Sequence, residues 1–474
     1  MKIKVGKKDL VLAAISQFMQ YGAAIFAIPV LSRTLNFSEI GLWYIFITIN
    51  SFALLFEMGF TPTLSRYFTN SIPNGLQRME PSKILQNERV PQTSVGNLVN
   101  ISKKIYFLIC IAVALVLGTL GTVYILSITP SIEGHTDVLI AWMMFCSATI
   151  INIYCNWQIA FLTGCGHQSD VYKSNIVIKS GFLIGVVCCY CLGSGILGIS
   201  FVWFASIICG KAQLCLITSR RMKSIIENER LSDRDNYDYV FHQLCVSSYK
   251  YGLVSIAAFL IVRSGVFFAT AAYGVAEGGR FAITQQVFMV IMALSQVVLT
   301  TCMPKMVQCR ATNDMTEFRR LFSLSIVSAV LLYVLGAIVF VIMILSSADR
   351  YIFGTSLFLD PHLLALMAVM YLLELIYACS GMAITTGNKV PLVGSSLISA
   401  LFILLGSLVV LNQQLPVICL ILTQLTVQIA YNNWKWPVVI AQEIHLGFSD
   451  LWKPIVSIFS MVFKNRSTDG DKRR

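Results

Sequence analysis

The chain has 474 residues, of which 56% are hydrophobic and only 12% charged, with a mean hydropathy of +0.74 and a formal net charge of +12. A soluble domain carries about 25% charged residues, so this composition excludes a soluble protein and indicates lipid as the main solvent. The 14 cysteines and five histidines follow no zinc-ligand spacing, which argues against a metal site.

Twelve apolar segments are long enough to cross a bilayer, because about 30 Å of hydrocarbon takes about 20 helical residues. In chain order they are 10–31, 39–60, 105–127, 138–163, 172–192, 195–217, 250–272, 280–302, 320–346, 361–385, 392–411 and 416–434. The first is too long for a signal peptide and has no small-residue cleavage site. The sequence therefore predicts an all-α membrane protein with about 12 transmembrane helices.

The basic residues lie almost entirely on one side of these spans. Of the 35 Lys and Arg residues, 28 fall in the amino end, the long polar loops and the tail, two (Arg33 and Arg350) in the opposite loops, and five within spans. Because cytoplasmic loops are enriched in Lys and Arg, both termini and the loops 61–104 and 218–249 are predicted to be cytoplasmic. The net positive charge thus reflects the orientation of the chain in the membrane, and it also attracts anionic membrane lipids weakly. We therefore expect no nucleic-acid partner.

Short glycine motifs recur at half the chain length. Glu39-Ile40-Gly41 begins span two and Glu277-Gly278-Gly279 begins span eight, while Leu162-Thr163-Gly164 ends span four and Thr385-Thr386-Gly387 ends span ten. The spacing predicts two six-helix lobes related by a parallel pseudo-two-fold repeat, a common plan of transporters. The expected divisions are a lobe at 1–217, a cytoplasmic linker at 218–249, a lobe at 250–438 and a cytoplasmic amphipathic tail at 439–474.

Sequence motifs for catalysis are missing. The pair Gly210-Lys211 lacks the preceding glycine and the following hydroxyl residue of a phosphate-binding loop, and neither HExxH nor a nucleophile elbow occurs. The chain is therefore expected to be no enzyme and to need no cofactor.

Polar residues inside the spans are the candidates for function, since such groups are costly in hydrocarbon and normally face a bundle interior or a wet cavity. Arg263 is the most informative, because it lies 13 residues into its span, about 20 Å deep. Two interpretations stay open for it: a buried ion pair with Glu374, or an anion-binding site in a cavity. The predicted set of cavity residues is Arg263, Arg280, Arg33, Lys250, Gln17, Gln20, Asn50, Glu57, Gln285, Gln286 and Glu374.

Three segments resemble a known family. They are Glu57-Met58-Gly59-Phe60 with the following TPTLSRYF, the run YGVAEGGRFAITQQVFMVIMALSQVVLTTCMPKM, and the turn Gly387-Asn388-Lys389. The chain resembles bacterial O-antigen and polysaccharide flippases of the polysaccharide transporter family, within the multidrug/oligosaccharidyl-lipid/polysaccharide exporter superfamily. It departs from their pattern in having Glu57 where Asp is common and Arg280 where an aromatic residue is common.

The resemblance implies a V-shaped pair of lobes with a central cavity lined by spans one, two, seven and eight. It implies a flippase in the bacterial inner membrane that moves an undecaprenyl-pyrophosphate-linked oligosaccharide, such as an O-antigen unit for lipopolysaccharide, to the periplasmic leaflet by alternating access. Coupling to Na⁺ or H⁺ and other polysaccharide assembly proteins as partners are also implied. Pyrophosphate requires cations and sugars require amides and hydroxyls, which the polar spans contain.

Two other functions remain. A cation-coupled multidrug antiporter of the same superfamily would use Glu57 and Glu374, but Arg263 would repel a cationic drug. A membrane-embedded glycosyltransferase or polymerase would need a large outer loop with a catalytic acid, and the predicted outer loops are short.

Overall fold

The computed structural model describes residues 7–71, 94–129, 135–226, 237–353, 357–387 and 391–447, and across these ranges it is helical without a strand. The predicted amphipathic tail is described only up to residue 447, and Asn388 and Lys389 of the predicted turn also lie outside the described residues.

The first half of the chain forms one bundle. Its helices are α1 (Lys7–Thr34), α2 (Phe37–Ala53), the 3₁₀ turn η1 (Leu54–Glu57), α3 (Phe60–Ser71), α4 (Val95–Val116), the π turn η3 (Leu117–Gly121), α5 (Thr122–Ile128), α6 (His135–Tyr154), α7 (Asn156–Gly164), α8 (Gln168–Leu192) and α9 (Gly195–Ile226). Within this first lobe α1 packs on α8, and α6 and α8 both pack on α9.

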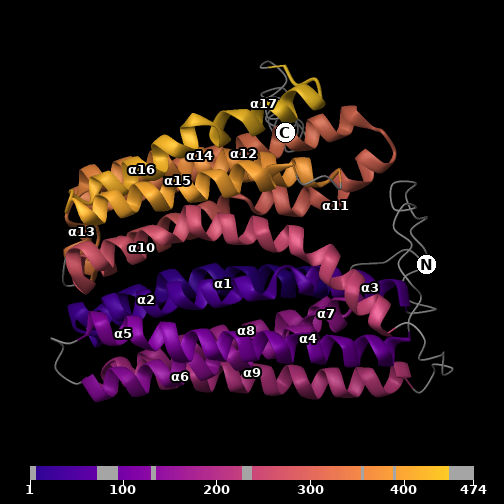
Figure 1. Cartoon of the computed structure of the whole chain (residues 1–474), viewed down its shortest axis with the longest axis horizontal. Coiled ribbons are helices and arrows are strands. Elements are labelled where there is room, and N and C mark those ends of the chain that lie inside the picture. The colour runs from indigo at the N-terminus through magenta and orange to yellow at the C-terminus, as the bar shows by residue number, and fades with distance from the viewer. Residues whose placement is uncertain are drawn as a thin grey trace, which may run out of the picture.

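The second half forms a matching bundle. Its helices are α10 (Tyr237–Ser295), α11 (Val297–Ala311), α12 (Met315–Leu345), α13 (Ala348–Phe353), α14 (Pro361–Thr385), α15 (Leu392–Asn412), α16 (Ile418–Ala430) and α17 (Asn432–Glu443). Here α10 packs on α15, α11 on α12, and α14 on α17. Figure 1 shows this second lobe, from pink to yellow, above the indigo and magenta first lobe.

Helix α10 is a hairpin of two antiparallel limbs that meet at Gly274. Gly274 has φ 86° and ψ 173°, a conformation that no continuous helix contains and that glycine adopts without a steric penalty. Gly278 lies directly against Thr270, and Gln285 donates a hydrogen bond to the carbonyl oxygen of Val262. Since these pairs are too far apart in sequence to touch within one helix, the chain reverses at Gly274, and predicted spans seven and eight form the two limbs.

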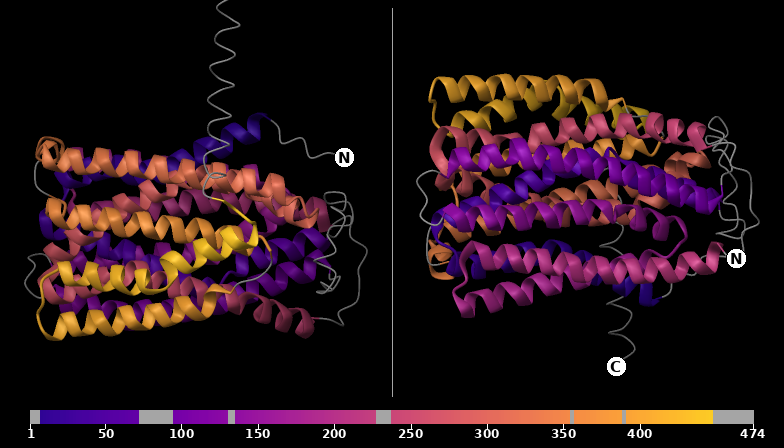
Figure 2. Two further views of the ribbon diagram at one scale, coloured as in Figure 1. Left: turned by 90° about the horizontal axis from the view of Figure 1, so that it is seen from above. Right: turned by 60° about the horizontal axis from the view of Figure 1, so that its bottom comes forward.

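Nine described segments are long and apolar enough to cross a membrane. One of them, Gly252–Ser295, contains both limbs of the α10 hairpin. The remaining predicted spans correspond to α1 and to the pair α16–α17, which is interrupted at Tyr431. The long helices run side by side with their ends gathered at two opposite ends of the molecule (Figure 2). The chain is therefore a multi-pass membrane protein, as the sequence predicted.

The exterior of the bundles is apolar. Large hydrophobic side chains such as Leu120, Leu192 and Leu345 are 69%, 79% and 63% exposed. A soluble protein rarely exposes contiguous apolar surface of this kind, whereas lipid chains cover it without cost. The buried side chains inside the bundles are also largely apolar, so the few polar groups there can be examined one by one.

The two lobes touch at a pair of glycines. A Cβ built on Gly279 would lie 2.4 Å from Cα of Gly41, and one on Gly41 would lie 2.5 Å from the carbonyl oxygen of Val275. Gly41 and Gly279 hold corresponding places in the sequence repeat. Two repeat-related residues can touch only near the axis that relates them, so the pseudo-two-fold axis passes close to this contact. Following the orientation predicted from the sequence, we call this end of the molecule, with the α1–α2 turn and α13, the outer end, and the opposite end the inner end.

Candidate transport site

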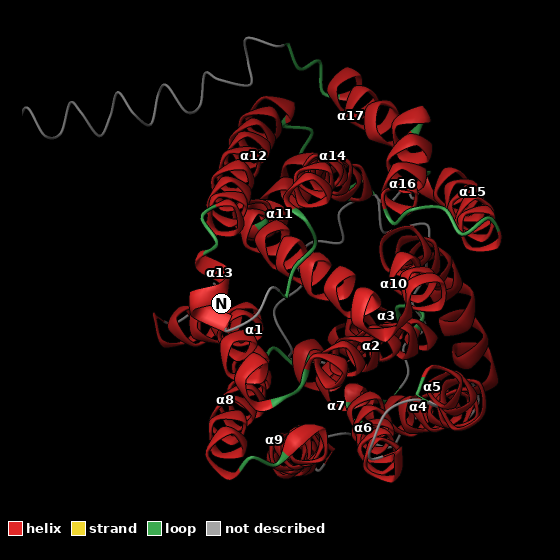
Figure 3. Ribbon diagram, turned by 90° about the vertical axis from the view of Figure 1, so that its left-hand side faces the viewer, coloured by secondary structure: helices red, strands yellow, loops and turns green. Residues whose placement is uncertain are grey.

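The seam between the lobes is closed along one side, where α2 and α3 run beside the first limb of α10. Ring centroids of Phe52 and Phe259 are 5.5 Å apart, and Met58 packs directly against Gly252. Nearer the inner end, the Tyr67 hydroxyl donates to Oε1 of Gln243 at 3.4 Å. Figure 3, which looks along the helices, shows α2, α3 and α10 together on this side of the seam and α1 on the other.

The opposite side of the seam is joined mainly at the outer end. There Nη2 of Arg33 donates to the carbonyl oxygen of Ile352 in α13 at 3.2 Å. Towards the inner end, Ile15 and Phe18 of α1 are 42% and 57% exposed, and Gln17 and Gln20 are also exposed. Helices α1 and α11 are not among the packed pairs of described helices. Two predicted cavity glutamines thus lie on a surface that the second lobe leaves uncovered.

Arg263 lies at the seam, on the first limb of α10. The residues one turn before and after it, Phe259 and Phe267, contact Phe52 of α2 and Tyr124 of α5 in the first lobe. Its Nη1 donates to Oε1 of Gln286 on the second limb at 3.4 Å. Among the described residues it forms no ion pair, so the structure does not contain the predicted alternative pair with Glu374.

Gln285 and Tyr371 form the wall next to Arg263. Nε2 of Gln285 donates to the hydroxyl of Tyr371 on α14 at 2.7 Å, and its Oε1 is buried without a partner in the described part of the chain. Tyr371 is close enough to Arg263 to interact with it electrostatically. The predicted residues Arg263, Gln285 and Gln286 therefore lie together, joined by a tyrosine from another helix.

Glu374 lies deeper, inside the second lobe, and is 7% exposed. Its Oε2 accepts a hydrogen bond from Nε2 of Gln428 at 3.0 Å. Gln428 in turn accepts from Asn432 at 2.8 Å, and Asn432 accepts from the indole of Trp436 at 3.1 Å. Glu374 is thus the end of a chain of side-chain amides from α16 and α17 that runs through the lobe interior.

Glu57 lies inside the first lobe, at a break in the second predicted span. The break consists of η1, Met58 with φ 46° and Gly59 with φ 72°. The Glu57 carboxylate accepts hydrogen bonds from the hydroxyls of Thr61 and Tyr106, the latter at 3.0 Å, and from Nδ2 of Asn156 at 2.9 Å. These donors come from α3, α4 and α7, so Glu57 joins three helices at one point.

The other predicted residues are dispersed. Asn50 accepts from Thr149 of α6 at 3.0 Å, inside the first lobe. Arg280 pairs with Glu277 at 2.7 Å and lies 4.9 Å from the ring centroid of Phe37, at the outer end of the seam. The side chain of Lys250 lies outside the described residues. Of the predicted residues that the structure describes, Arg263, Gln285 and Gln286 come together: Arg263 bonds directly to Gln286, and Gln285 bonds to the carbonyl oxygen of Val262 next to Arg263.

Sequence reasoning overlooked the residues around Glu57. Lys211 is 4% exposed and interacts electrostatically with Glu57 and Cys155, yet it is absent from the predicted set of cavity residues. It lies near the end of the predicted span 195–217, where a lysine side chain can reach the membrane interface, so its depth offered no signal. Asn156 offered no signal, because one amide in a span is more often a helix–helix contact.

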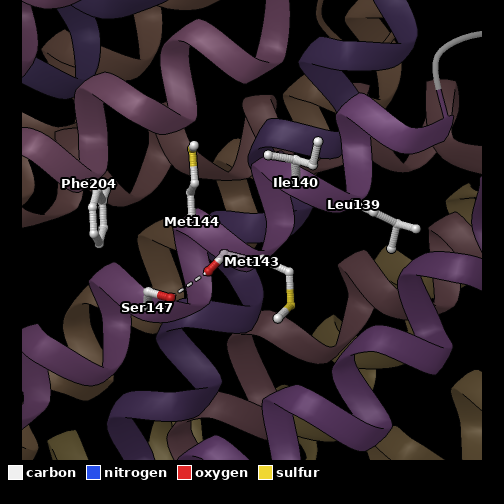
Figure 4. Close-up of a pocket in the computed structure, with 6 residues that line it drawn as sticks. All are labelled: Leu139, Ile140, Met143, Met144, Ser147 and Phe204. Atoms are coloured by element: carbon white, nitrogen blue, oxygen red, sulfur yellow. Dashed lines mark hydrogen bonds between the residues drawn. The ribbon is translucent and has the colours of Figure 1, made fainter.

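A shallow hollow of about 330 Å³ lies between α6 and α9, away from all these groups. Figure 4 shows its lining of Leu139, Ile140, Met143, Met144, Ser147 and Phe204. Its one hydroxyl, on Ser147, donates back to the carbonyl oxygen of Met143 at 2.8 Å. Without a converging polar group, this hollow fits packing against lipid chains rather than a transport site.

The chain has the fold of known transporters. It is similar to an inward-facing multidrug resistance MATE family transporter of the MOP superfamily (TM-score 0.62, 12% identity, 94% of this chain and 99% of that chain). It is also similar to the lipid II flippase MurJ in an inward closed conformation (TM-score 0.61, 11% identity, 98% and 93%). A third match is the MATE multidrug transporter DinF-BH in complex with R6G (TM-score 0.62, 12% identity, 93% and 96%).

No family model and no curated protein matches the sequence. At these identities the structural matches show the fold alone, a V-shaped arrangement of two helical lobes. The predicted fold class is thereby confirmed, whereas the choice between a lipid-linked oligosaccharide and a drug as substrate is not resolved.

Proposed function

We propose that this protein is a flippase that moves an undecaprenyl-pyrophosphate-linked oligosaccharide from the cytoplasmic to the periplasmic leaflet of a bacterial inner membrane by alternating access. The head group would cross between the lobes while the polyprenyl tail stays in the bilayer. The O-antigen class of substrate and the cytoplasmic placement of both termini rest on the sequence resemblance and on the distribution of Lys and Arg.

The observation that supports this proposal most is the state of Arg263. An unpaired charge at mid-membrane costs at least about 2.5–3.5 kcal/mol on insertion scales. Arg263 has an amide, Gln286, as its hydrogen-bond partner and no ion pair among the described residues. A guanidinium at the seam, free of a carboxylate, fits a pyrophosphate, which it can bind through paired charge-assisted hydrogen bonds.

The asymmetry of the seam also supports a lipid-linked substrate. The α2–α10 side is packed along its length, whereas this part of α1 leaves Gln17 and Gln20 uncovered on one face and Ile15 and Phe18 exposed on the other. Glutamines can bind sugar hydroxyls, and the apolar face can contact lipid chains. A substrate that is polar at one end and apolar at the other suits these two faces of α1.

A cation-coupled multidrug antiporter is the second candidate. Glu374 favours it, because a buried carboxylate can hold a coupling cation or attract a cationic drug. Two of the similar structures are multidrug transporters. Against it, Arg263 lies at the seam near Tyr371, the neighbour of Glu374, and its positive charge would repel a cationic drug.

The test is export of surface polysaccharide by cells that depend on this protein. Arg263→Ala should lower export at least about tenfold, because a charge-assisted hydrogen bond contributes about 1.5–3 kcal/mol. Arg263→Lys should retain part of it, since the charge remains and the forked geometry is lost. Efflux of a cationic dye such as rhodamine 6G is measured in the same cells.

Arg350→Ala is the matched control. Arg350 is an exposed arginine of α13, so cells with this variant should export polysaccharide normally. All variants are compared at equal protein level in the membrane. Normal polysaccharide with Arg263→Ala would remove Arg263 from the transport site. If Arg263→Ala abolishes dye efflux and leaves surface polysaccharide unchanged, the antiporter function would be supported in place of the flippase function.

A further inference from the structure

A buried carboxylate joins two cations at the inner end of the first lobe. The turn between α8 and α9 lies at the outer end, where the backbone nitrogen of Ile196 donates to Glu39 at 3.1 Å, so the start of α8 and the end of α9 meet at the inner end. There Asp170 of α8 is 4% exposed, and it pairs with Lys173 at 2.7 Å and with Arg221 of α9 at 3.3 Å. The Asp170 carboxylate thus ties the two helix ends together and holds both cations in one place.

Two further cations on the last turns of α9 have no partner. Arg220 and Lys223 are exposed, and within the described ranges neither has a hydrogen bond, an ion pair or an aromatic ring beside it. By contrast, Lys103, which also lies towards the inner end, is 5.2 Å from the ring centroid of Trp157. Together with the Asp170 group, Arg220 and Lys223 form what we call the α8–α9 basic cluster. Its four cations and one carboxylate give a net formal charge of +3.

The unpaired cations lie on an apolar, outward-facing side of α9. Leu216 of α9 is 62% exposed, and Arg220 and Lys223 follow it at four and seven residues, which places all three on one face of the helix. Figure 3 shows α8 and α9 at the edge of the molecule, on the side of the first lobe away from the second lobe. Ile184 of α8 is also 66% exposed. Lipid chains that cover this side therefore end beside Arg220 and Lys223.

The depth of these cations matches that of lipid phosphate. Arg220 lies 25 residues beyond Gly195, the first residue of α9, which is about 38 Å at about 1.5 Å per residue. Because the hydrocarbon core is about 30 Å thick, Arg220 and Lys223 reach the head-group region. Residues three apart on a helix are neighbours, so a guanidinium and an ammonium can bind the same phosphate through charge-assisted hydrogen bonds.

We propose that the α8–α9 basic cluster is a binding site for an anionic phospholipid of the leaflet at the inner end, such as phosphatidylglycerol. The lipid phosphate binds between Arg220 and Lys223, and the acyl chains lie along the face of α9 that exposes Leu216. The two cations held by Asp170 add positive potential next to the phosphate. The site lies in the first lobe and away from the seam, so it holds whichever substrate the seam carries.

The experiment measures lipid binding to the purified full-length protein in neutral detergent by native mass spectrometry. Phosphatidylglycerol is compared with zwitterionic phosphatidylcholine that has the same acyl chains, and the unmodified protein should bind the first at least about tenfold more tightly. Arg220→Ala together with Lys223→Ala should abolish this preference and leave phosphatidylcholine binding unchanged, because both groups that hold the phosphate are lost. Arg220→Lys together with Lys223→Arg keeps both charges and should retain most of the preference.

Lys305→Ala together with Arg320→Ala is the matched control. This variant also loses two exposed cations at the inner end, but both are already paired with Glu317, at 2.8 Å and 3.4 Å. Its preference for phosphatidylglycerol should therefore equal that of the unmodified protein. A second measurement is the melting temperature, which phosphatidylglycerol should raise more than phosphatidylcholine does, and this difference should disappear in the Arg220 and Lys223 double variant.

Equal binding of the two lipids by the unmodified protein would overturn the proposal. An equal loss of preference in the control variant would overturn it as well, because the attraction would then be a general effect of net charge. If the double alanine variant does not fold, the single variants Arg220→Ala and Lys223→Ala decide, each with a smaller loss. Since no polysaccharide or dye enters these assays, their outcome is independent of the proposed transport function.

Discussion

Two carboxylates inside the lobes, the half-buried Glu57 and the buried Glu374, are held in opposite ways. Glu57 of the first lobe accepts hydrogen bonds from three other residues and has the Lys211 ammonium nearby. Glu374 of the second lobe accepts one hydrogen bond, from Gln428, and has no ion pair within the described ranges. The first lobe therefore surrounds its carboxylate with donors and a cation, whereas the second leaves its carboxylate at the end of a chain of amides.

This difference matters for the seam. If Glu374 were the partner of Arg263, the deepest cation at the seam would be neutralised in place. Arg263 instead donates to Gln286, and Tyr371 stands near both charged groups. The Glu57 carboxylate lies inside the first lobe among its donors, whereas the Arg263 guanidinium lies at the seam without an ion pair among the described residues. The following variants test this comparison, from the largest expected effect to the smallest.

Glu57→Ala should lower the free energy of unfolding by about 2–3 kcal/mol, because the Asn156 amide loses its acceptor and the Thr61 and Tyr106 hydroxyls keep only each other as partners. Glu374→Ala removes one acceptor and also one buried carboxylate, so its cost should be about 1 kcal/mol. Denaturant titration in mixed micelles, followed by tryptophan fluorescence, measures both. Equal costs would contradict the comparison.

A double-mutant cycle of Glu57→Gln and Lys211→Met should give a coupling free energy of about 1–2 kcal/mol, because the two groups interact through a low-dielectric interior. The double variant should therefore lose less free energy of unfolding than the sum of the losses of the two single variants. Strict additivity would mean that the Lys211 ammonium and the Glu57 carboxylate are independent.

The same cycle on Arg263→Ala and Glu374→Ala should be additive within about 0.5 kcal/mol, because the two side chains form neither an ion pair nor a hydrogen bond with each other. The double variant should also fail to restore export, because Arg263 is lost as a ligand. Recovery of both stability and export would revive the ion pair between them.

Glu374→Gln should have the smallest effect, below about 0.5 kcal/mol, because the amide oxygen of glutamine can still accept from Gln428 and no partner cation is lost. Gln428→Leu is the informative counterpart, since it removes the donor and leaves the carboxylate buried alone. Unfolding of the glutamine variant at much lower denaturant would show that the charge of Glu374 itself stabilises the second lobe.

The sequence predicted the scaffold well. All twelve apolar segments correspond to described helices, and the glycines chosen from the half-length repeat, Gly41 and Gly279, touch each other at the crossing of the lobes. Both predictions rest on local signals. A long apolar run needs only lipid to be stable, and a glycine at a close helix crossing is required by the approach of two backbones.

The site was predicted only in part. The depth of Arg263 in its span predicts it, the polar character of Gln285 and Gln286 within a span predicts them, and the three residues lie together. Glu57 is in the predicted set of cavity residues, but its carboxylate turns into the first lobe towards Tyr106 and Asn156. Lys211 is missing from the predicted set, because it lies near the end of its predicted span, where a lysine can reach the membrane interface.

The sequence by itself determined that the chain is a repeated bundle of membrane helices, since hydrophobic length and the position of basic loops are properties of each segment. Only the tertiary structure decided which polar groups meet: Arg263 with Gln286 across the Gly274 hairpin, Glu374 with Gln428, and Glu57 with donors from three helices. The physical reason is that helical periodicity fixes the face on which a side chain lies, whereas its partner depends on how helices far apart in sequence are rotated and packed against each other.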